Sequence, residues 1–251
     1  MDYRTALVTG ASSGLGRGLA LWFARRGVKV YAAARRTPQL ASLADEARGA
    51  GGEVVAVELD VSRTQETLAR IRELDAACGG LDLVVANAGV GEPTPGRKLE
   101  WEVVQRTIDV NITGAAATLS AVLPQMVARG RGHLVGVSSL AAYRGLPGNA
   151  AYSASKAFLA TFCESLRVDL QGTGVRVTSL HPGFVKSEMT AKNRDPMPFL
   201  LETQAGVEHM GEAILRAKAE YGFPWPMRSA LRVIKVLPNA VFDRIGRRVP
   251  R

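Results

Sequence analysis

Strand-like segments alternate with segments of helical length along most of the chain, and this alternation restricts the fold more than any other feature. Short runs rich in small and β-branched apolar residues lie at 6–9, 29–34, 53–58, 81–86, 133–138 and 175–180. Segments long enough for helices lie at 14–26, 38–49, 62–77, 99–129 and 152–171. Such an order is typical of βαβ units, whose strands form a parallel sheet. We therefore predict an α/β fold with a doubly wound parallel sheet, whose ligand crevice opens at the carboxyl ends of the strands.

Length and cysteine content limit the organisation of the chain. Its 251 residues, 47% of them hydrophobic, are enough for one large core, so we predict a single domain over 1–251. No apolar run approaches the roughly 20 residues that span a bilayer, and the first strand-like run lies too near Met1 for a signal peptide, so a cytoplasmic protein is expected. Cys78 and Cys163 have no CxxC spacing and no His cluster, which predicts neither a disulfide framework nor a metal site.

A glycine-rich loop follows the first strand-like run and precedes a helical segment. It reads Thr9-Gly10-Ala11-Ser12-Ser13-Gly14-Leu15-Gly16. Glycines allow the backbone to turn tightly and to approach a pyrophosphate, while the amino end of a helix offers unpaired N–H groups and partial positive charge. The spacing differs from GxGxxG, and many strand-to-helix turns contain glycine, so the loop by itself is also compatible with an ordinary turn.

Tyr152 and Lys156 lie at the start of the predicted helix 152–171. Four positions separate them, which places both side chains on one helical face, one turn apart. A phenol has a reference pKa near 10, and bringing it to about 7 takes roughly 4 kcal/mol of preferential stabilisation of the phenolate. A nearby ammonium group in a partly dry cleft can supply that stabilisation. Without other signals, a Tyr-x-x-x-Lys pair usually marks an exposed helix face.

Together, the glycine loop and the Tyr152/Lys156 pair resemble the TGxxxGxG and YxxxK motifs of the short-chain dehydrogenase/reductase family, in its standard-length type. The resemblance extends over residues 3–190 and implies a Rossmann-type fold. It also implies that Ser139, at the end of the fifth strand-like run and thirteen positions before Tyr152, is the catalytic serine in preference to Ser138.

The same resemblance implies roles for residues that carry no clear signal by themselves. Asn111 matches the family's asparagine that kinks the long helix and holds a water in a proton relay through Lys156; alone, it would be a mid-helix residue without a role. His181 is expected to be a packing residue, because no acid or nucleophile is assigned near it. Ser187 replaces the usual threonine of the PGxVxT segment and keeps the hydroxyl. The residues expected to contact a nicotinamide dinucleotide are Gly10, Ser12, Ser13, Gly14, Leu15, Gly16, Asp60, Val61, Asn87, Ala88, Gly89, Tyr152, Lys156, Pro182, Gly183, Val185 and Ser187.

The end of the second strand-like run favours NADP(H) over NAD(H) as the cofactor. Ala34 stands where an NAD-binding chain would carry an acid for the free ribose 2′-OH. Arg35, together with Arg36 and Ser13, can instead hold a 2′-phosphate. Two arginines at a strand end are also compatible with a solvated pair, and the loop lacks the basic residue that some NADP(H) members carry at the position of Ser13.

The resemblance implies an enzyme that transfers a hydride between nicotinamide and a carbonyl or alcohol of a small-molecule substrate. Tyr152 would donate a proton to the carbonyl oxygen, Ser139 would orient that oxygen, and Lys156 would bind the ribose and lower the pKa of Tyr152. The cytoplasmic NADP pool would favour reduction. A catalytically silent dinucleotide sensor or scaffold is the alternative, because a fold does not determine a function.

The last quarter of the chain departs from the resemblance. Many relatives end with a seventh strand and an Asp-Gly-Gly segment at a tetramer interface; we find neither in this sequence, so a homo-oligomer is expected with a dimer favoured over a tetramer. Residues 186–227 are rich in Pro, Met and aromatic side chains and are predicted to form a helical lid over an apolar pocket. Each of these apolar residues is equally compatible with the core of the last helices.

Residues 228–251 form a predicted basic amphipathic tail. They hold seven basic residues against one acid, and thus six of the nine net positive charges of the chain. Arg228, Arg232 and Lys235 share one helical stripe. Packing on the protein's own body or on a partner subunit is the favoured interpretation, and a weak contact with an anionic membrane surface is the alternative. Nucleic acid is not an expected partner, because few aromatic residues accompany the charge.

Overall fold

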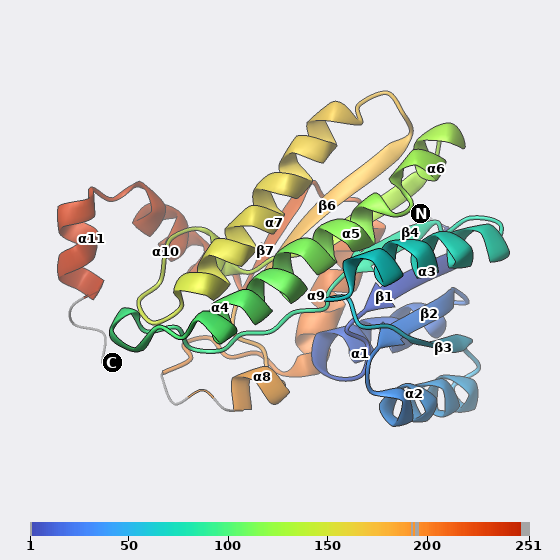
Figure 1. The fold of residues 1–251 in the computed structure, drawn as a ribbon, viewed down its shortest axis with the longest axis horizontal. Helices are drawn as coiled ribbons and strands as arrows, with labels where there is room; N and C mark the ends of the chain where they lie inside the picture. The colour runs from blue at the N-terminus through green and yellow to red at the C-terminus, as the bar shows by residue number, and fades with distance from the viewer. Residues whose placement is uncertain (1, 192, 194–195, 247–251) are drawn as a thin grey trace.

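The computed structural model describes residues 2–191, 193 and 196–246, and seven strands of that part form one parallel sheet (Figure 1). The strands are β1 (Thr5–Thr9), β2 (Lys29–Ala34), β3 (Val54–Glu58), β4 (Leu83–Ala86), β5 (Gly132–Val137), β6 (Val175–Pro182) and β7 (Glu220–Phe223). Their order in the sheet is β3-β2-β1-β4-β5-β6-β7, so the direction of winding reverses between β1 and β4. A crevice for ligands opens at such a switch point, beyond the carboxyl ends of the strands. The predicted doubly wound sheet of Rossmann type is confirmed.

Helices cover both faces of the sheet (Figure 1). One face packs against α1 (Gly14–Ala24), α2 (Thr37–Gly49) and α9 (Thr203–Leu215), and the other against α3 (Thr64–Ala77), α5 (Ala115–Ser120) and α7 (Ala150–Asp169). Because successive side chains of a strand point to opposite faces, Val8 belongs to the first cluster of buried residues and its neighbour Leu7 to the second. Strands buried on both faces explain the near-continuous apolar runs of the sequence.

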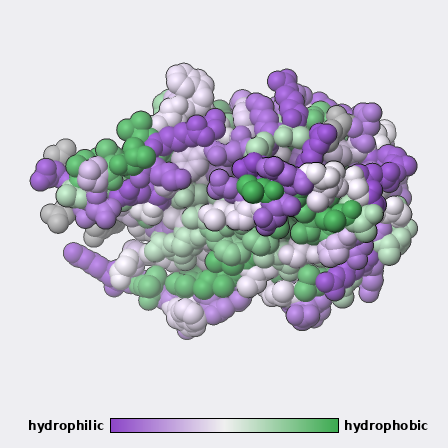
Figure 2. Space-filling model, turned by 90° about the horizontal axis from the view of Figure 1, so that it is seen from above, coloured by the Kyte–Doolittle hydropathy of each residue, from purple (hydrophilic) through white to green (hydrophobic). Residues whose placement is uncertain are grey.

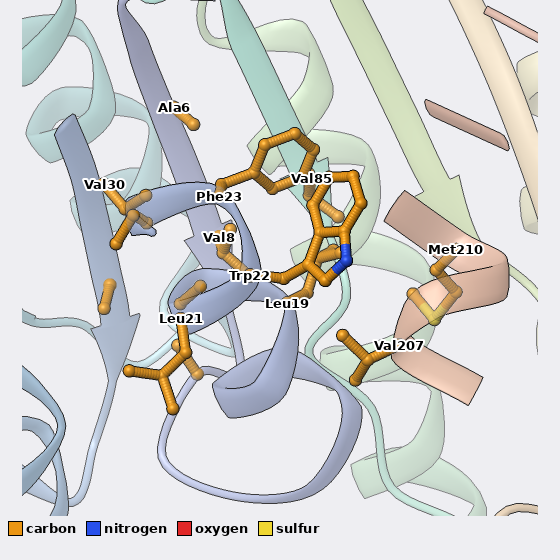
Figure 3. Close-up of a cluster of buried hydrophobic side chains, with 14 of the residues drawn as sticks. Ala6, Val8, Leu19, Leu21, Trp22, Phe23, Val30, Val85, Val207 and Met210 are labelled. Carbon is orange, nitrogen blue, oxygen red and sulfur yellow. The ribbon is translucent and has the colours of Figure 1, made fainter. Parts of the chain in front are cut away.

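The core between α1 and α9 is built around Trp22 and Phe23 (Figure 3). The two rings meet edge to face with centroids 5.0 Å apart, and Val207 and Met210 of α9 belong to the same cluster. Gly211 allows the close approach, since a Cβ at this position would lie 2.6 Å from the Trp22 ring. This packing fixes α1, and with it the glycine-rich loop from which α1 begins.

The helical segment predicted over 99–129 is interrupted. It consists of α4 (Trp101–Ile108), a π-helical turn (Asp109–Gly114), α5, and α6 (Leu123–Ala128). The kink expected at Asn111 is therefore present as a π-turn. Gly114 lies so near the loop after β3 that a Cβ there would be 2.7 Å from the carbonyl oxygen of Val61. Interruptions of this kind are often found at functional sites.

The stretch Trp101–Ala128 is long and apolar enough to cross a membrane by length and composition, contrary to the expectation from its sequence. Its mean hydropathy reaches 1.3, and 56% of the scored window is buried within the protein. Core helices of soluble proteins pass the same test, and α5 contributes Leu119 to the core, so burial in the protein accounts for the apolar composition.

The C-terminal region differs from the sequence-based expectation in two respects. The seventh strand, which sequence analysis did not find, is present as β7 and pairs with β6, with Glu220 opposite Ser179. The predicted lid over 186–227 is too long, because α9 packs against α1 and β7 extends the sheet; within the described residues of that range, α8 (Glu188–Ala191) stands at the carboxyl ends of the strands.

Two further helices, α10 (Trp225–Val236) and α11 (Asn239–Gly246), form one end of the molecule (Figure 1). The predicted start of the tail at Arg228 is thus three residues too late, because α10 already begins at Trp225. Arg247, Arg248 and Arg251 of that tail lie outside the described residues. The described part of the chain also contains two short 3₁₀ helices, η1 (Gly96–Lys98) and η3 (Leu140–Ala142).

A buried histidine in the core makes the stability of the protein depend on pH. His133 on β5 bonds Tyr3 Oη at 2.7 Å and Thr178 Oγ1 at 2.8 Å, and burial, assisted by the charge of Arg176, lowers its pKa to about 3. Below pH 6.5, His133 of the unfolded chain therefore binds a proton, whereas His133 of the native protein stays neutral down to about pH 3. Each pH unit in that window should cost about 1.4 kcal/mol of unfolding free energy. We expect the unfolding free energy of His133→Gln, measured with urea between pH 7 and 5, to fall less steeply toward low pH than that of the wild type, by about this amount per pH unit. Equal pH slopes for the two proteins would contradict this role of His133.

Candidate active site

Tyr152 and Lys156 lie in the first two turns of α7, beside the carboxyl end of β5. Lys156 is buried, its Nζ donates to the carbonyl oxygen of Val137 at 2.9 Å, and it lies 5.7 Å from the centre of the Tyr152 ring. Burial lowers the pKa of Lys156 to about 8, so its ammonium form still predominates at pH 7. The structure thus brings the predicted phenol and ammonium together on one helical face.

Ser139 lies two positions after the end of β5 and faces the phenol of Tyr152. Burial raises the pKa of Tyr152, and a hydrogen bond with the Ser139 side chain acts in the opposite direction. The Ser139 hydroxyl also donates to the carbonyl oxygen of Pro182 at 3.3 Å. It accepts from the N–H of Ala141 at 3.1 Å and so caps the amino end of η3. Ser138, the alternative weighed from the sequence, donates instead to the carbonyl oxygen of Lys156 at 2.7 Å and so ties β5 to α7.

Asn111 of the π-turn connects three parts of the site. Its Nδ2 donates to the carbonyl oxygen of Val90 at 2.9 Å and to Ser155 Oγ at 3.0 Å, and its Oδ1 accepts the N–H of Val90 at 2.8 Å. Gly89 lies in the same corner, where a Cβ would come within 3.3 Å of Lys156 Nζ and 3.4 Å of Asn111 Oδ1. The side chain therefore positions the segment after β4 against α7, and the proton-relay role stays a prediction.

The glycine-rich loop and the segment after β4 lie against each other without space for side chains. Gly10 has a φ of +68°, and a Cβ there would meet Ala88 Cα at 2.7 Å; a Cβ at Gly16 would meet Asn87 Nδ2 at 2.4 Å. Asn87 fixes the contact by donating from Nδ2 to the carbonyl oxygen of Thr9 at 2.9 Å. This cradle leaves bare backbone at the carboxyl ends of β1 and β4.

The amino end of α1, which begins at Gly14, has neither an acid in its first turn nor a side-chain cap from Ser13. Its N–H groups and partial positive charge suit the pyrophosphate of a dinucleotide. Ser187 lies across the loop, since a Cβ on Gly14 would be 3.4 Å from Ser187 Cβ. Leu15 and Val185 instead pack near Gly206 of α9 and contribute apolar support.

Two arginines follow β2, and the structure gives them different surroundings from those expected. Arg36, not Arg35, lies over the glycine loop, with Nη2 2.7 Å from Ser13 Oγ and 3.0 Å from Ser12 Oγ. Arg35 is largely exposed and lies 3.9 Å from Asp60, whose carboxylate also accepts from Ser62. The structure thus places Arg36, and not Arg35, in contact with the loop, and which of the two arginines holds a phosphate stays a prediction.

A carboxylate already lies among the groups expected to bind an anion. Glu188 of α8 accepts from Arg36 Nη1 at 2.9 Å and from Ser13 Oγ at 3.3 Å. This internal carboxylate is a stand-in for an anionic ligand, since phosphate and carboxylate oxygens are recognised by the same guanidinium and hydroxyl donors. The residues present therefore fit a phosphate-bearing dinucleotide.

The comparisons with known proteins agree with this geometry. Residues 4–198 match the family model of the short chain dehydrogenases. The chain belongs to the short-chain dehydrogenase family. An uncharacterized oxidoreductase of Myxococcus xanthus is 68% identical over 99% of this chain and 98% of its own, and a ketoacyl reductase of a Nostoc species is 32% identical over 78% of this chain and 69% of its own.

Solved structures of relatives contain both kinds of dinucleotide. A short-chain dehydrogenase from Sphingobium yanoikuyae in complex with NADPH superposes with a TM-score of 0.82 at 25% identity, covering 98% of this chain and 96% of that one. A relative from Burkholderia phymatum in complex with NAD gives 0.84 at 25% identity, covering 92% of each chain. This short-chain dehydrogenase is accordingly an oxidoreductase that uses a nicotinamide dinucleotide.

This short-chain dehydrogenase also has polar groups behind Ser139 that sequence reasoning missed. The His181 ring donates from Nδ1 to the carbonyl oxygen of Ser139 at 3.3 Å and accepts at Nε2 from Ser179 Oγ at 2.9 Å. Tyr143 lies beside that ring and donates to Glu220 of β7 at 2.7 Å. Burial lowers the pKa of His181, which keeps it neutral. The buried His181 ring thus holds the Ser139 backbone in place, and the interpretation of His181 as a packing residue stays a prediction.

Proposed function

We propose that this protein is an NADP(H)-dependent reductase of apolar ketones or aldehydes in which Tyr152 is the proton donor. The observation that carries the proposal is the convergence of Tyr152, Ser139 and Lys156 at the same edge of the sheet as the uncapped amino end of α1. The relative named a ketoacyl reductase supports a carbonyl substrate. The dinucleotide, when bound, supplies a hydride or accepts one.

The chain's own residues handle the proton and the substrate oxygen. Because burial raises the pKa of Tyr152, its phenol is protonated at neutral pH, which is the form that carbonyl reduction requires. The Ser139 hydroxyl, next to that phenol, donates to the same substrate oxygen and stabilises the developing negative charge. The Lys156 ammonium favours the phenolate that remains after proton transfer. With the proton and both donors in place, reduction is the proposed direction.

Two methionines support an apolar substrate. Met189 of α8 and Tyr152 border the same small space, because a Cβ on Gly91 would lie 3.0 Å from Met189 Sδ and 3.3 Å from the Tyr152 ring. Met227 of α10 lies against Gly183, 3.0 Å from where a Cβ of that glycine would be. Flexible thioether side chains fit irregular apolar ligands. Lipid-like or aromatic carbonyl compounds are therefore the proposed class.

NADP(H) is the proposed cofactor because Arg36 and Ser13 already hold a carboxylate. We expect Arg36→Ala to weaken NADPH binding by about 10- to 100-fold, because the charge-assisted hydrogen bonds to the 2′-phosphate are lost. NADH has no 2′-phosphate, so its binding should stay unchanged. Fluorescence titration of the purified protein with each dinucleotide measures both constants. Arg35→Ala is the matched control, with an effect of no more than severalfold on NADPH.

Glu188→Gln should act in the opposite direction. Removing the carboxylate that occupies Arg36 and Ser13 lowers the competition for a 2′-phosphate, so NADPH binding should tighten severalfold and NADH binding should not. Glu202→Gln, which removes the carboxylate paired with Lys186, is the control. If Arg36→Ala weakened NADPH and NADH equally, the assignment of NADP(H) would be wrong.

A further inference from the structure

The two C-terminal helices carry exposed apolar side chains in addition to those that they turn toward the protein. In an ordinary surface helix the apolar stripe faces the core and the charged side faces water. On α10 the exposed stripe consists of Trp225, Val233 and Val236, at spacings of eight and three residues, with 76%, 61% and 78% of their surfaces exposed. On α11, Val241 and Ile245 are 44% and 46% exposed. These five residues are called the C-terminal apolar face.

Polar and apolar contacts together hold α10 to the body. Arg228 and Arg232 reach Glu220 of β7 at 3.5 and 3.1 Å, and Leu231 is the residue of this helix that is buried. Glu220 also accepts from Tyr143, which follows the Ser139 loop. The two ion pairs and the burial of Leu231 therefore orient α10 so that Trp225, Val233 and Val236 stay outward.

The corner between α10 and α11 is fixed as well. Arg144 donates to the carbonyl oxygens of Lys235 and Leu237 at 2.9 and 3.2 Å and to Asn239 Oδ1 at 2.7 Å. Its guanidinium lies 4.5 Å from the centre of the Phe242 ring. The C-terminal apolar face is thus presented by helices that are attached at several points. Figure 2 shows hydrophobic side chains gathered at the end of the molecule where these helices lie.

Positive charge surrounds this face. Lys235 and Arg244 are exposed beside it, and the sequence continues with Arg247, Arg248 and Arg251, against a single acid, Asp243. A second copy of the chain on the same face would bring these charges together in a two-fold contact, where they repel. Nucleic acid would meet the charge but gain nothing from exposed valines. A bilayer with acidic headgroups matches both features, because it accepts apolar side chains beneath a layer of negative charge.

We propose that the C-terminal apolar face docks this protein on the surface of an anionic lipid bilayer. The valines and Ile245 enter the boundary between headgroups and acyl chains, Trp225 lies at the interface, and the basic residues pair with acidic headgroups. The proposal does not depend on the proposed function.

The test is sedimentation of the full-length protein with vesicles of phosphatidylcholine, with and without 30% phosphatidylglycerol, at low and high salt. The wild type should bind the anionic vesicles at least about tenfold more tightly than the neutral ones, and high salt should weaken this binding. Val233→Ser combined with Val236→Ser should reduce binding about tenfold or more, through lost apolar burial. Val168→Ser, an exposed valine on α7, is the matched control and should bind like the wild type.

Two more readouts separate the competing occupants. In a Trp101→Phe background, Trp225 is the exposed tryptophan that remains, and its emission should shift to the blue on anionic vesicles. Molar mass from light scattering reports self-association of the wild type and of the double serine variant, and NADPH titration checks that the variant is folded. The proposal is overturned if the wild type binds neither vesicle, if the double variant binds as well as the wild type, or if the double variant changes a dimer to a monomer without vesicle binding.

Discussion

Tyr152→Phe should lower kcat for carbonyl reduction by about 10²- to 10⁴-fold, the range lost when a positioned general acid is removed. The phenyl ring keeps the shape of the side chain in α7, while the proton that burial holds on the phenol is gone. NADPH binding should change little, since the glycine loop and Arg36 remain. Steady-state kinetics over a panel of apolar ketones and aldehydes measures kcat, and fluorescence titration measures NADPH binding.

Tyr221→Phe is the matched control for this variant. It removes a phenol on β7 whose oxygen bonds His209 at 3.0 Å, away from Ser139 and Lys156. Its kcat should stay within a few fold of the wild type. A Tyr152→Phe enzyme with unimpaired turnover would show that the proton comes from elsewhere, and would return weight to the dinucleotide-sensing alternative.

Lys156→Met has the second large effect expected, and activity and stability should respond in opposite ways. The substitution keeps an unbranched side chain but removes the positive charge 5.7 Å from the Tyr152 ring. We expect kcat to fall about 10²- to 10³-fold, the scale of losing one preorganised electrostatic contact. The pH at which alcohol oxidation gains activity should also rise, because the phenolate loses its cationic neighbour. Rate profiles from pH 6 to 10 measure both.

The same lysine costs stability. Its pKa is lowered to about 8 by burial, so below pH 8 both the native and the unfolded chain carry the charge and the burial penalty is fully present. Between pH 8 and 10.5 the native protein releases that proton first, and the unfolding free energy of the wild type should gain up to about 3 kcal/mol relative to Lys156→Met. Urea unfolding at pH 7.5 and 10 tests this. Lys218→Met, which removes an ammonium lying 4.3 Å from the Tyr221 ring, should not change the pH dependence.

The strands of the sheet could be predicted from the sequence where they are buried on both faces. β1, β4 and β5 contain short apolar runs bounded by glycines, which is typical of buried strands. β7 was missed because its four residues, Glu-Tyr-Gly-Phe, have neither alternation nor an apolar run. Its position depends on pairing with β6, which is a tertiary contact. The network of Tyr143 with Glu220 was missed for the same reason.

The motif residues of the candidate site were predictable, and their surroundings were not. Tyr152, Lys156 and Ser139 converge because a helical turn and the end of one strand bring them together. The choice between Arg35 and Arg36 could not be made from sequence, since the turn after β2 breaks the strand alternation that would have assigned a direction to each. The carboxylate of Glu188 on Arg36 likewise spans 152 positions of the chain. Local patterns carry no record of such a contact.

The measurement that tests the central claim most directly is hydride transfer from NADPH deuterated at C4 of the nicotinamide to a panel of apolar ketones and aldehydes. We predict that deuterium is found on the carbinol carbon of the product alcohol, that NADPH is a far better donor than NADH, and that Tyr152→Phe slows the transfer about 10²- to 10⁴-fold. Tight NADPH binding without deuterium transfer to any carbonyl compound would contradict it.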